Sequence, residues 1–217
     1  PEVVVEANNR IRELEGEEKR EIVRILTEFT DLLRPQVPAI LQSYAFLAEI
    51  DFIRAKALFA KEIHAVKPIV EEKHIIDWSG AFHPLLFLSM EKQGKKVVPL
   101  DIELDDEHRI LIISGPNAGG KSVCLKTVGL LQYMIQCGLP VPMYASSHMG
   151  IFRNIFIDIG DEQSIENDLS TYSSHLTNMK YFVRNCDEST LILIDEFGSG
   201  TEPQIGGAIA EALLDRF

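Results

Sequence analysis

Apolar residues recur along the chain at two different spacings, and the spacing changes near residue 67. Between residues 17 and 63 they recur every three or four positions, which predicts helices with one apolar face. Pro35 and Pro38 interrupt this pattern, so we expect one helix to end there and a second to run from about Ala39 to Ile63. A short proline-containing connection between two long helices predicts an antiparallel helical hairpin. Residues 1–15 are expected to form the end of a further helix.

Beyond residue 67, short strand-like apolar runs alternate with helical patterns. Strands are expected at residues 97–104, 109–114, 155–159 and 191–194, and helices at residues 121–136, 170–185 and from 203 onward. This alternation predicts an α/β fold with a mainly parallel sheet. We therefore divide the chain into a helical segment, residues 1–70, and an α/β domain, residues 71–217. The last helix is still in phase at Phe217, so we expect a fragment truncated within that domain.

A glycine-rich loop joins the expected strand at residues 109–114 to the following helix. Its sequence matches GxxxxGK[ST] and reads Gly115, Pro116, Asn117, Ala118, Gly119, Gly120, Lys121 and Ser122. Glycines let backbone N–H groups converge on a polyphosphate, and the new helix adds its positive end. Lys121 is expected to reach the β and γ phosphates of ATP, Ser122 to bind Mg²⁺, and Val123 to complete the nucleotide-binding set. A plain glycine-rich turn is the alternative, but the strand–loop–helix order favours phosphate binding.

A second motif supports the first. The apolar run at residues 191–194 ends in two carboxylates, Asp195 and Glu196. Ligands of open α/β sheets bind at the carboxyl ends of the strands, where both acids are expected to lie. Asp195 is expected to hold Mg²⁺ through water, and Glu196 to orient the attacking water. A strand that stops at a charged turn would explain the pair alone, but not its combination with the phosphate loop.

Composition narrows the possible partners. The net charge is −12, with 33 acidic and 21 basic residues, which argues against a broad DNA-binding surface on this segment. No apolar run approaches the roughly 18 residues of a membrane span, so we expect no membrane association and a cytoplasmic location. Cys124, Cys137 and Cys186 are expected to be reduced and at least half-buried. The six histidines show no ligand spacing, so no zinc site is predicted.

Three further stretches show a family resemblance when taken with the phosphate loop. They are Ile159-Gly160-Asp161-Glu162-Gln163-Ser164-Ile165, Leu169-Ser170-Thr171-Tyr172-Ser173-Ser174-His175-Leu176 and Phe197-Gly198-Ser199-Gly200-Thr201-Glu202-Pro203. Together they resemble the MutS family of DNA mismatch-repair ATPases, and more closely its bacterial second branch, MutS-two. Residues 3–60 are similar to the core domain of that branch. The resemblance covers nearly the whole chain and implies a P-loop NTPase domain related to ABC-type ATPases.

The resemblance also implies roles for residues between and beside the two motifs. Gln163 occupies the position that senses Mg²⁺ and the γ-phosphate. Ser170 and Thr171 occupy the signature position, which in such dimers caps the nucleotide bound by the other subunit; an ordinary helix N-cap is the alternative. His83-Pro84 resembles a His-Pro step at the start of the ATPase domain, and Val98-Pro99 lie near where the family packs against adenine.

As a function, the resemblance implies an ATP-binding and ATP-hydrolysing domain of a DNA repair and recombination protein. It would couple ATP turnover, with ADP as product, to clamp motion on mismatched or branched DNA. The full-length parent would be a homodimer that contacts DNA through regions absent from this chain. The isolated fragment is expected to hydrolyse ATP poorly, because it ends before the family's histidine loop.

Two other functions remain. A role on stalled ribosomes is the alternative within the same branch. A transporter or chromosome-structure ATPase of the ABC type is disfavoured, because Leu169-Ser170 is followed by Thr171 and Tyr172 instead of the glycines of that signature.

Overall fold

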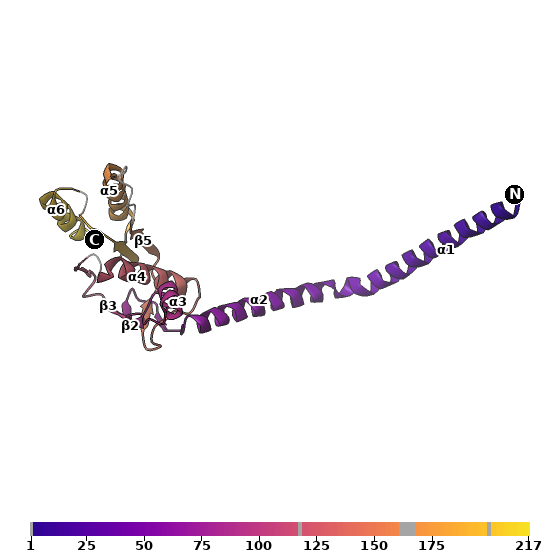
Figure 1. Cartoon of the computed structure of the whole chain (residues 1–217), viewed down its shortest axis with the longest axis horizontal. Coiled ribbons are helices and arrows are strands. Elements are labelled where there is room, and N and C mark those ends of the chain that lie inside the picture. The colour runs from indigo at the N-terminus through magenta and orange to yellow at the C-terminus, as the bar shows by residue number, and fades with distance from the viewer. Residues whose placement is uncertain (1, 117–118, 161–167, 199–200) are drawn as a thin grey trace. The chain divides into compact units, whose positions relative to one another are not determined.

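The computed structural model describes residues 2–116, 119–160, 168–198 and 201–217, with the side chains of residues 168–172 excepted (Figure 1). The chain forms two compact units, residues 1–55 and residues 56–217. Each is described by itself below.

The first unit is helical throughout. Helix α1 spans Glu2–Leu33, the 3-10 turn η1 spans Arg34–Gln36, and α2 spans Val37–Glu62, with its last turns in the second unit. Leu33 and Val37, which flank η1, both have right-handed helical backbone angles. The expected antiparallel hairpin is therefore wrong, because the chain continues in helical conformation past Pro35. Proline is accepted there because the first turn of a helix does not use its N–H groups.

The apolar face of α1, and of α2 as far as residue 55, is uncovered. Helix α1 starts at Glu2 without a break near residue 15, so the expected separate helix at residues 1–15 is part of α1. Neither α1 nor α2 has a buried residue, and Leu26 and Phe29 are each 58% exposed. On the polar side, Arg24 pairs with Glu21 and Glu28 one turn away. The sequence pattern thus predicted the helical conformation correctly, but not the bounds of α1 or what covers its apolar face.

In the described residues of the second unit there are two small sheets and four further helices. The larger sheet has the order β1-β4-β2-β3, and a separate parallel pair is formed by β5 and β6. The strands are β1 Ile69–Glu71, β2 Ile76–Ala81, β3 Leu100–Leu104, β4 His148–Gly150, β5 Asn154–Asp158 and β6 Thr190–Ile194. The helices are α3 Pro84–Lys92, α4 Lys121–Gln136, α5 Asp168–Asn185 and α6 Pro203–Leu214. The expected helices after residues 120, 169 and 202 are thus confirmed within two residues.

The sheet prediction is confirmed only in part. Among the described residues, β1 with β4 and β5 with β6 are parallel, whereas β2 is antiparallel to both β3 and β4. The larger sheet is therefore mixed, and a mainly parallel sheet is not what forms. The expected strand at residues 109–114 is wrong, since this segment has no strand conformation and Ile112 is 72% exposed. A strand needs a neighbouring ladder, and no described strand pairs with this segment.

The core of the second unit joins residues that are distant in the sequence. Ile63, Trp78, Leu131 and Met149 are at most 1% exposed and come from four different segments. Helix α4 also packs closely on the β5–β6 pair at Gly129, where an added Cβ would lie 2.9 Å from Leu193 Cδ1. This contact brings the helix that follows the glycine-rich loop onto the strand that precedes the acidic pair.

Two other expectations concern the surface of the molecule. Cys124 and Cys186 are half-buried free thiols as expected, but Cys137 is exposed, because it caps the C-terminal end of α4. In the parts of the chain that the structure describes, no helix combines the length and the apolar character needed to cross a membrane.

Candidate functional site

Two glycines of the glycine-rich loop have backbone conformations that favour glycine. Gly115 and Gly120 have φ values of 152° and 85°, which side chains of L-residues rarely allow. An added Cβ at either glycine would meet no atom within 4 Å, so these glycines are needed for conformation and not for space. Gly119 N donates to Pro116 O at 2.9 Å and tightens the turn. Asn117 and Ala118 lie outside the described residues.

The start of α4 presents backbone amides at the positive end of a helix. Gly120 is its N-cap, and the first bond of the helical ladder runs from Cys124 N to Gly120 O at 2.9 Å. The amides of Lys121, Ser122 and Val123 lie ahead of that bond, at the end where anions bind. These three residues belong to the predicted nucleotide-binding set.

The side chain of Lys121 folds back onto the first residue of the loop. Its Nζ donates to the main-chain oxygen of Gly115 at 2.5 Å, across six residues of the loop. Ser122 is half-buried at the foot of the loop, and Val123 is 43% exposed. The start of α4 thus carries a lysine ammonium, a serine hydroxyl and backbone N–H groups that have no partner within the helix. This set of donors is suited to an anionic, oxygen-rich ligand.

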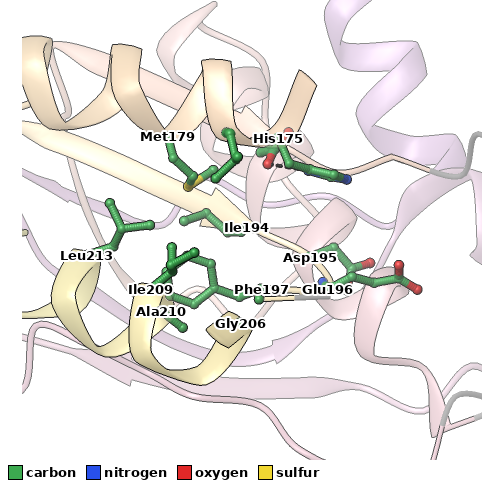
Figure 2. Close-up of a pocket in the computed structure, with 13 residues that line it drawn as sticks. His175, Met179, Ile194, Asp195, Glu196, Phe197, Gly206, Ile209, Ala210 and Leu213 are labelled. Atoms are coloured by element: carbon green, nitrogen blue, oxygen red, sulfur yellow. Dashed lines mark hydrogen bonds and ion pairs between the residues drawn. The ribbon is translucent and has the colours of Figure 1, made fainter. Parts of the chain in front are cut away.

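The acidic pair begins one residue after β6. Asp195 N donates to Asp158 O at 2.9 Å, so the β5–β6 pairing extends one step past the strand. Asp195 Oδ1 then accepts from Glu196 N at 3.0 Å. Glu196 itself has a φ of 52°, a left-handed conformation that costs a non-glycine residue about 1–3 kcal/mol. Figure 2 shows the carboxylates of Asp195 and Glu196 directed away from the apolar side chains of Ile209 and Leu213.

The segment after Glu196 is held against the start of α6 by two glycines. Gly198 has a φ of 82°, and a Cβ added to Gly206 would lie 2.1 Å from Gly198 O. The two backbones therefore touch directly, and any side chain at Gly206 would separate them. Ser199 and Gly200, in one of the stretches that carry the family resemblance, lie outside the described residues.

A buried polar cluster lies beside the acidic pair, and the sequence analysis missed it. Asp158 is 6% exposed at the end of β5, and its Oδ2 is 2.6 Å from His175 Nδ1. Asn178 Nδ2 donates to Asp158 Oδ1 at 2.8 Å. His175 and Asn178 are three residues apart on α5, a spacing that places both on one helix face. This spacing, together with an aspartate at the end of an expected strand, was the sequence signal that could have indicated the cluster.

A small hollow lies between the end of β6, α5 and α6 (Figure 2). Met179, Ile194, Ile209 and Leu213 give it an apolar lining. It offers water about 30 Å³, room for one or two molecules and too little for a nucleotide. The hollow is thus a packing defect behind the acidic pair and not the nucleotide site.

The structure places some predicted site residues on elements that pack against each other and leaves others undescribed. Lys121 lies eight residues, about 12 Å of helix, before the Gly129 contact with β6, and Asp195 lies two residues after Leu193. The glycine-rich loop and the acidic pair are therefore attached to a helix and a strand that pack against each other. Ser170 and Thr171 fall within the first turn of α5 and not at its N-cap, since α5 begins at Asp168. Gln163 lies outside the described residues.

The His83-Pro84 step forms the start of helix α3. His83 caps α3, its Nδ1 accepts from Leu86 N at 3.4 Å, and Pro84 is buried in the first turn. Burial lowers the pKa of His83, and the charge of Lys126 on α4 lowers it further. The capping role needs an imidazole lone pair, and a lowered pKa preserves it. Val98, expected near adenine, is 87% exposed.

Residues 111–217 match the family model described as MutS domain V. This match covers the start of α4, the acidic pair and all of α5 and α6. It defines the class of this part of the chain, a domain of an ATPase family.

Relatives cover the rest of the chain as well. Proteins named Endonuclease MutS2 are 46% identical over 215 residues in Geobacillus sp. (strain WCH70), 45% over 215 residues in Carboxydothermus hydrogenoformans and 46% over 217 residues in Finegoldia magna. These alignments take in 99%, 99% and 100% of this chain, and 27% of each relative. The chain belongs to the MutS family and is MutS2-like, and it spans about a quarter of the length of these relatives.

Proposed function

We propose that this domain binds ATP with Mg²⁺ at residues 115–123 and hydrolyses it. The observation that carries the proposal is the start of α4, where three amides ahead of the helical ladder, the Lys121 ammonium and the Ser122 hydroxyl meet behind two glycines of positive φ. Each of these groups is a donor to phosphate oxygens or an oxygen ligand for a hard cation. A bare glycine-rich turn would not require this combination.

The oxygen donors fit a magnesium ion. Mg²⁺ prefers oxygen ligands and retains several waters, so one hydroxyl and one or two carboxylates suffice from the protein. Ser122 is the hydroxyl, Asp195 is the carboxylate, and Gln163 is a further ligand. Bound in this way, Mg²⁺ would neutralise charge on the phosphates during hydrolysis.

Glu196 is the residue that orients and polarises the attacking water. Its carboxylate is exposed one residue beyond the proposed metal ligand Asp195. The left-handed backbone at Glu196 turns the chain out of the strand direction at this point. Strained backbone of this kind is commonly kept at sites where it aims a functional group.

In the complete protein, the domain would act in a homodimer on DNA. Ser170 and Thr171, at the first turn of α5, would cap the nucleotide of the partner subunit. ATP binding and hydrolysis would then drive clamp motion on mismatched or branched DNA, in repair or recombination. The net charge of −12 fits DNA contact through other parts of the complete protein. A role on stalled ribosomes remains the second candidate, because the ATPase site is compatible with either target.

The phosphate loop is tested by Lys121→Ala, with Lys126→Ala on the same helix as the matched control. Removal of Lys121 takes away the only side-chain ammonium of the motif, so we expect ATP affinity to fall by about a hundredfold or more, the loss of a charge-assisted contact in a preorganised site. Titration of a fluorescent ATP analogue with the complete protein measures it. Unchanged affinity in Lys121→Ala would refute the phosphate-loop assignment.

A further inference from the structure

The buried cluster of Asp158, His175 and Asn178 has no part in the proposed chemistry, yet it touches both halves of the site. The side chain of Asp158 contacts α5 through two hydrogen bonds, 2.6 Å to His175 Nδ1 and 2.8 Å to Asn178 Nδ2. Its main-chain oxygen accepts from Asp195 N at 2.9 Å. One residue therefore connects the helix that carries Ser170 and Thr171 to the strand end that carries Asp195 and Glu196.

The contacts of Asp158 restrict the movement of α5 relative to the end of β6. Asp158 is 6% exposed, and a buried carboxylate that loses one of its partners is left with a costly unsatisfied oxygen. A carboxylate oxygen only accepts, so His175 donates from Nδ1. Thr171 lies one helical turn before His175 on α5. A shift of α5 along or around its axis would displace its first turn and would at the same time break these hydrogen bonds.

We infer that His175 is a positioning residue, which through Asp158 fixes the first turn of α5 relative to the Asp195–Glu196 step. This inference rests on the proposed ATPase function. Among the described residues, His175 hydrogen-bonds to Asp158 and not to the glycine-rich loop, which is held by its own turn and by the Lys121 bond to Gly115. The positioning role therefore concerns turnover, while nucleotide binding at the loop is independent of it.

The chain contains a matched control pair. His148 Nδ1 on β4 lies 2.5 Å from Glu71 Oε1 on β1, so it is a second histidine–carboxylate contact of the same kind. It lies in the mixed sheet, whereas β6 belongs to the separate β5–β6 pair. The side chains of His148 and Glu71 are 34% and 27% exposed, compared with 22% for His175.

The experiment compares His175→Ala, His175→Asn and His148→Ala in the complete protein. We expect His175→Ala to lower kcat for ATP by about tenfold to a hundredfold, the usual effect of a small misplacement in a catalytic site, with little change in ATP affinity. Asparagine places an amide nitrogen near the position of Nδ1, so His175→Asn should restore most of kcat. His148→Ala should leave kcat and affinity unchanged.

Other outcomes overturn the inference. A kcat of His175→Ala equal to that of His148→Ala, or a parallel loss of kcat, ATP affinity and melting temperature without rescue by asparagine, would leave only a structural role. If His175→Ala does not fold, the milder Asn178→Ala variant decides on the same criteria. Lys121→Ala separates this result from the wider proposal: if that variant binds ATP normally, the proposed function fails; if it loses ATP while His175→Ala turns over normally, only the positioning role fails.

Discussion

The two units of this chain show equally clear apolar patterns, but they use them differently. In residues 1–55, the apolar positions of α1 lie on an open surface, and Leu26 is 58% exposed. In residues 56–217, Leu131 of α4 is fully buried, at 0% exposed. The comparison shows that a three- and four-residue spacing predicts a helix and its apolar side, whereas the cover for that side comes from elsewhere.

The largest effect that can test this contrast comes from one substitution made in both units. Leu131→Ala removes a buried side chain and should lower the free energy of unfolding by about 2–5 kcal/mol. Leu26→Ala removes an exposed side chain and should change it by less than about 0.5 kcal/mol. The single tryptophan, Trp78, is buried at 1% exposed, so its fluorescence during urea unfolding reports on the second unit. Far-UV circular dichroism follows the helices of both units, so a change in it without a change in Trp78 fluorescence reports on the first unit.

A large loss of unfolding free energy in Leu26→Ala would contradict this difference between the two units. A loss of about 2 kcal/mol or more for Leu26→Ala in the 217-residue chain would mean that the apolar face of α1 is covered in solution. The same measurement in the complete protein then shows whether other parts of the protein supply that cover.

Local signals explain what the sequence predicted well. The starts of α4 and α6 follow from Gly120, Lys121 and Pro203, all of which act within one turn of the chain. The helical continuation past Pro35 was not predicted, because proline in the first turn of a helix and proline in a hairpin connection give the same sequence pattern.

Long-range pairing explains what the sequence could not give. The apolar runs at residues 109–114 and 191–194 are alike, but among the described strands only the second run has a pairing partner, β5. The cluster around Asp158 was missed for a similar reason, since His175 and Asn178 are 17 and 20 residues away from it. The family resemblance, by contrast, is confirmed, because it rests on contiguous motifs.

A smaller effect tests how closely the second unit is packed beside the site. Gly206 and Gly207 are neighbours in α6, but a Cβ at Gly206 would lie 2.1 Å from Gly198 O, whereas a Cβ at Gly207 would meet nothing within 4 Å. Gly206→Ala should therefore destabilise the second unit by about 1–3 kcal/mol, through forced backbone movement. Gly207→Ala should stabilise it by up to about 1 kcal/mol, because alanine favours helix. Urea unfolding followed by Trp78 fluorescence measures both.

The first unit supplies the control for this pair. Gly16 lies within α1, and the nearest atom to an added Cβ is the flexible end of Arg20, at 3.4 Å. Gly16→Ala should therefore resemble Gly207→Ala and raise the helical signal of the first unit. If Gly206→Ala were also stabilising, the close contact between Gly198 and Gly206 would not exist in solution.

The smallest expected effect is a pH dependence specific to the second unit. Burial lowers the pKa of His83, and Lys126 adds to this effect, so the folded state favours the neutral imidazole that caps α3. In the unfolded chain, His83 regains its ordinary pKa of about 6.5 and takes up a proton first as the pH falls. Its contribution to stability is therefore complete above about pH 7 and declines as the pH falls through 6.5 towards the lowered folded pKa.

His83→Asn isolates this contribution. Asparagine is a good N-cap, so the variant should keep α3 while it removes the titrating group. We expect the unfolding free energy of the second unit, followed by Trp78 fluorescence, to fall between pH 7 and pH 5 by less in His83→Asn than in the unmodified chain. The difference should stay below the slope of one full proton, because His83 is only half-buried. If the unfolding free energy depended on pH equally in both proteins, protonation of His83 would not be disfavoured in the folded state. The proposed electrostatic effect of Lys126 on His83 would then be unsupported.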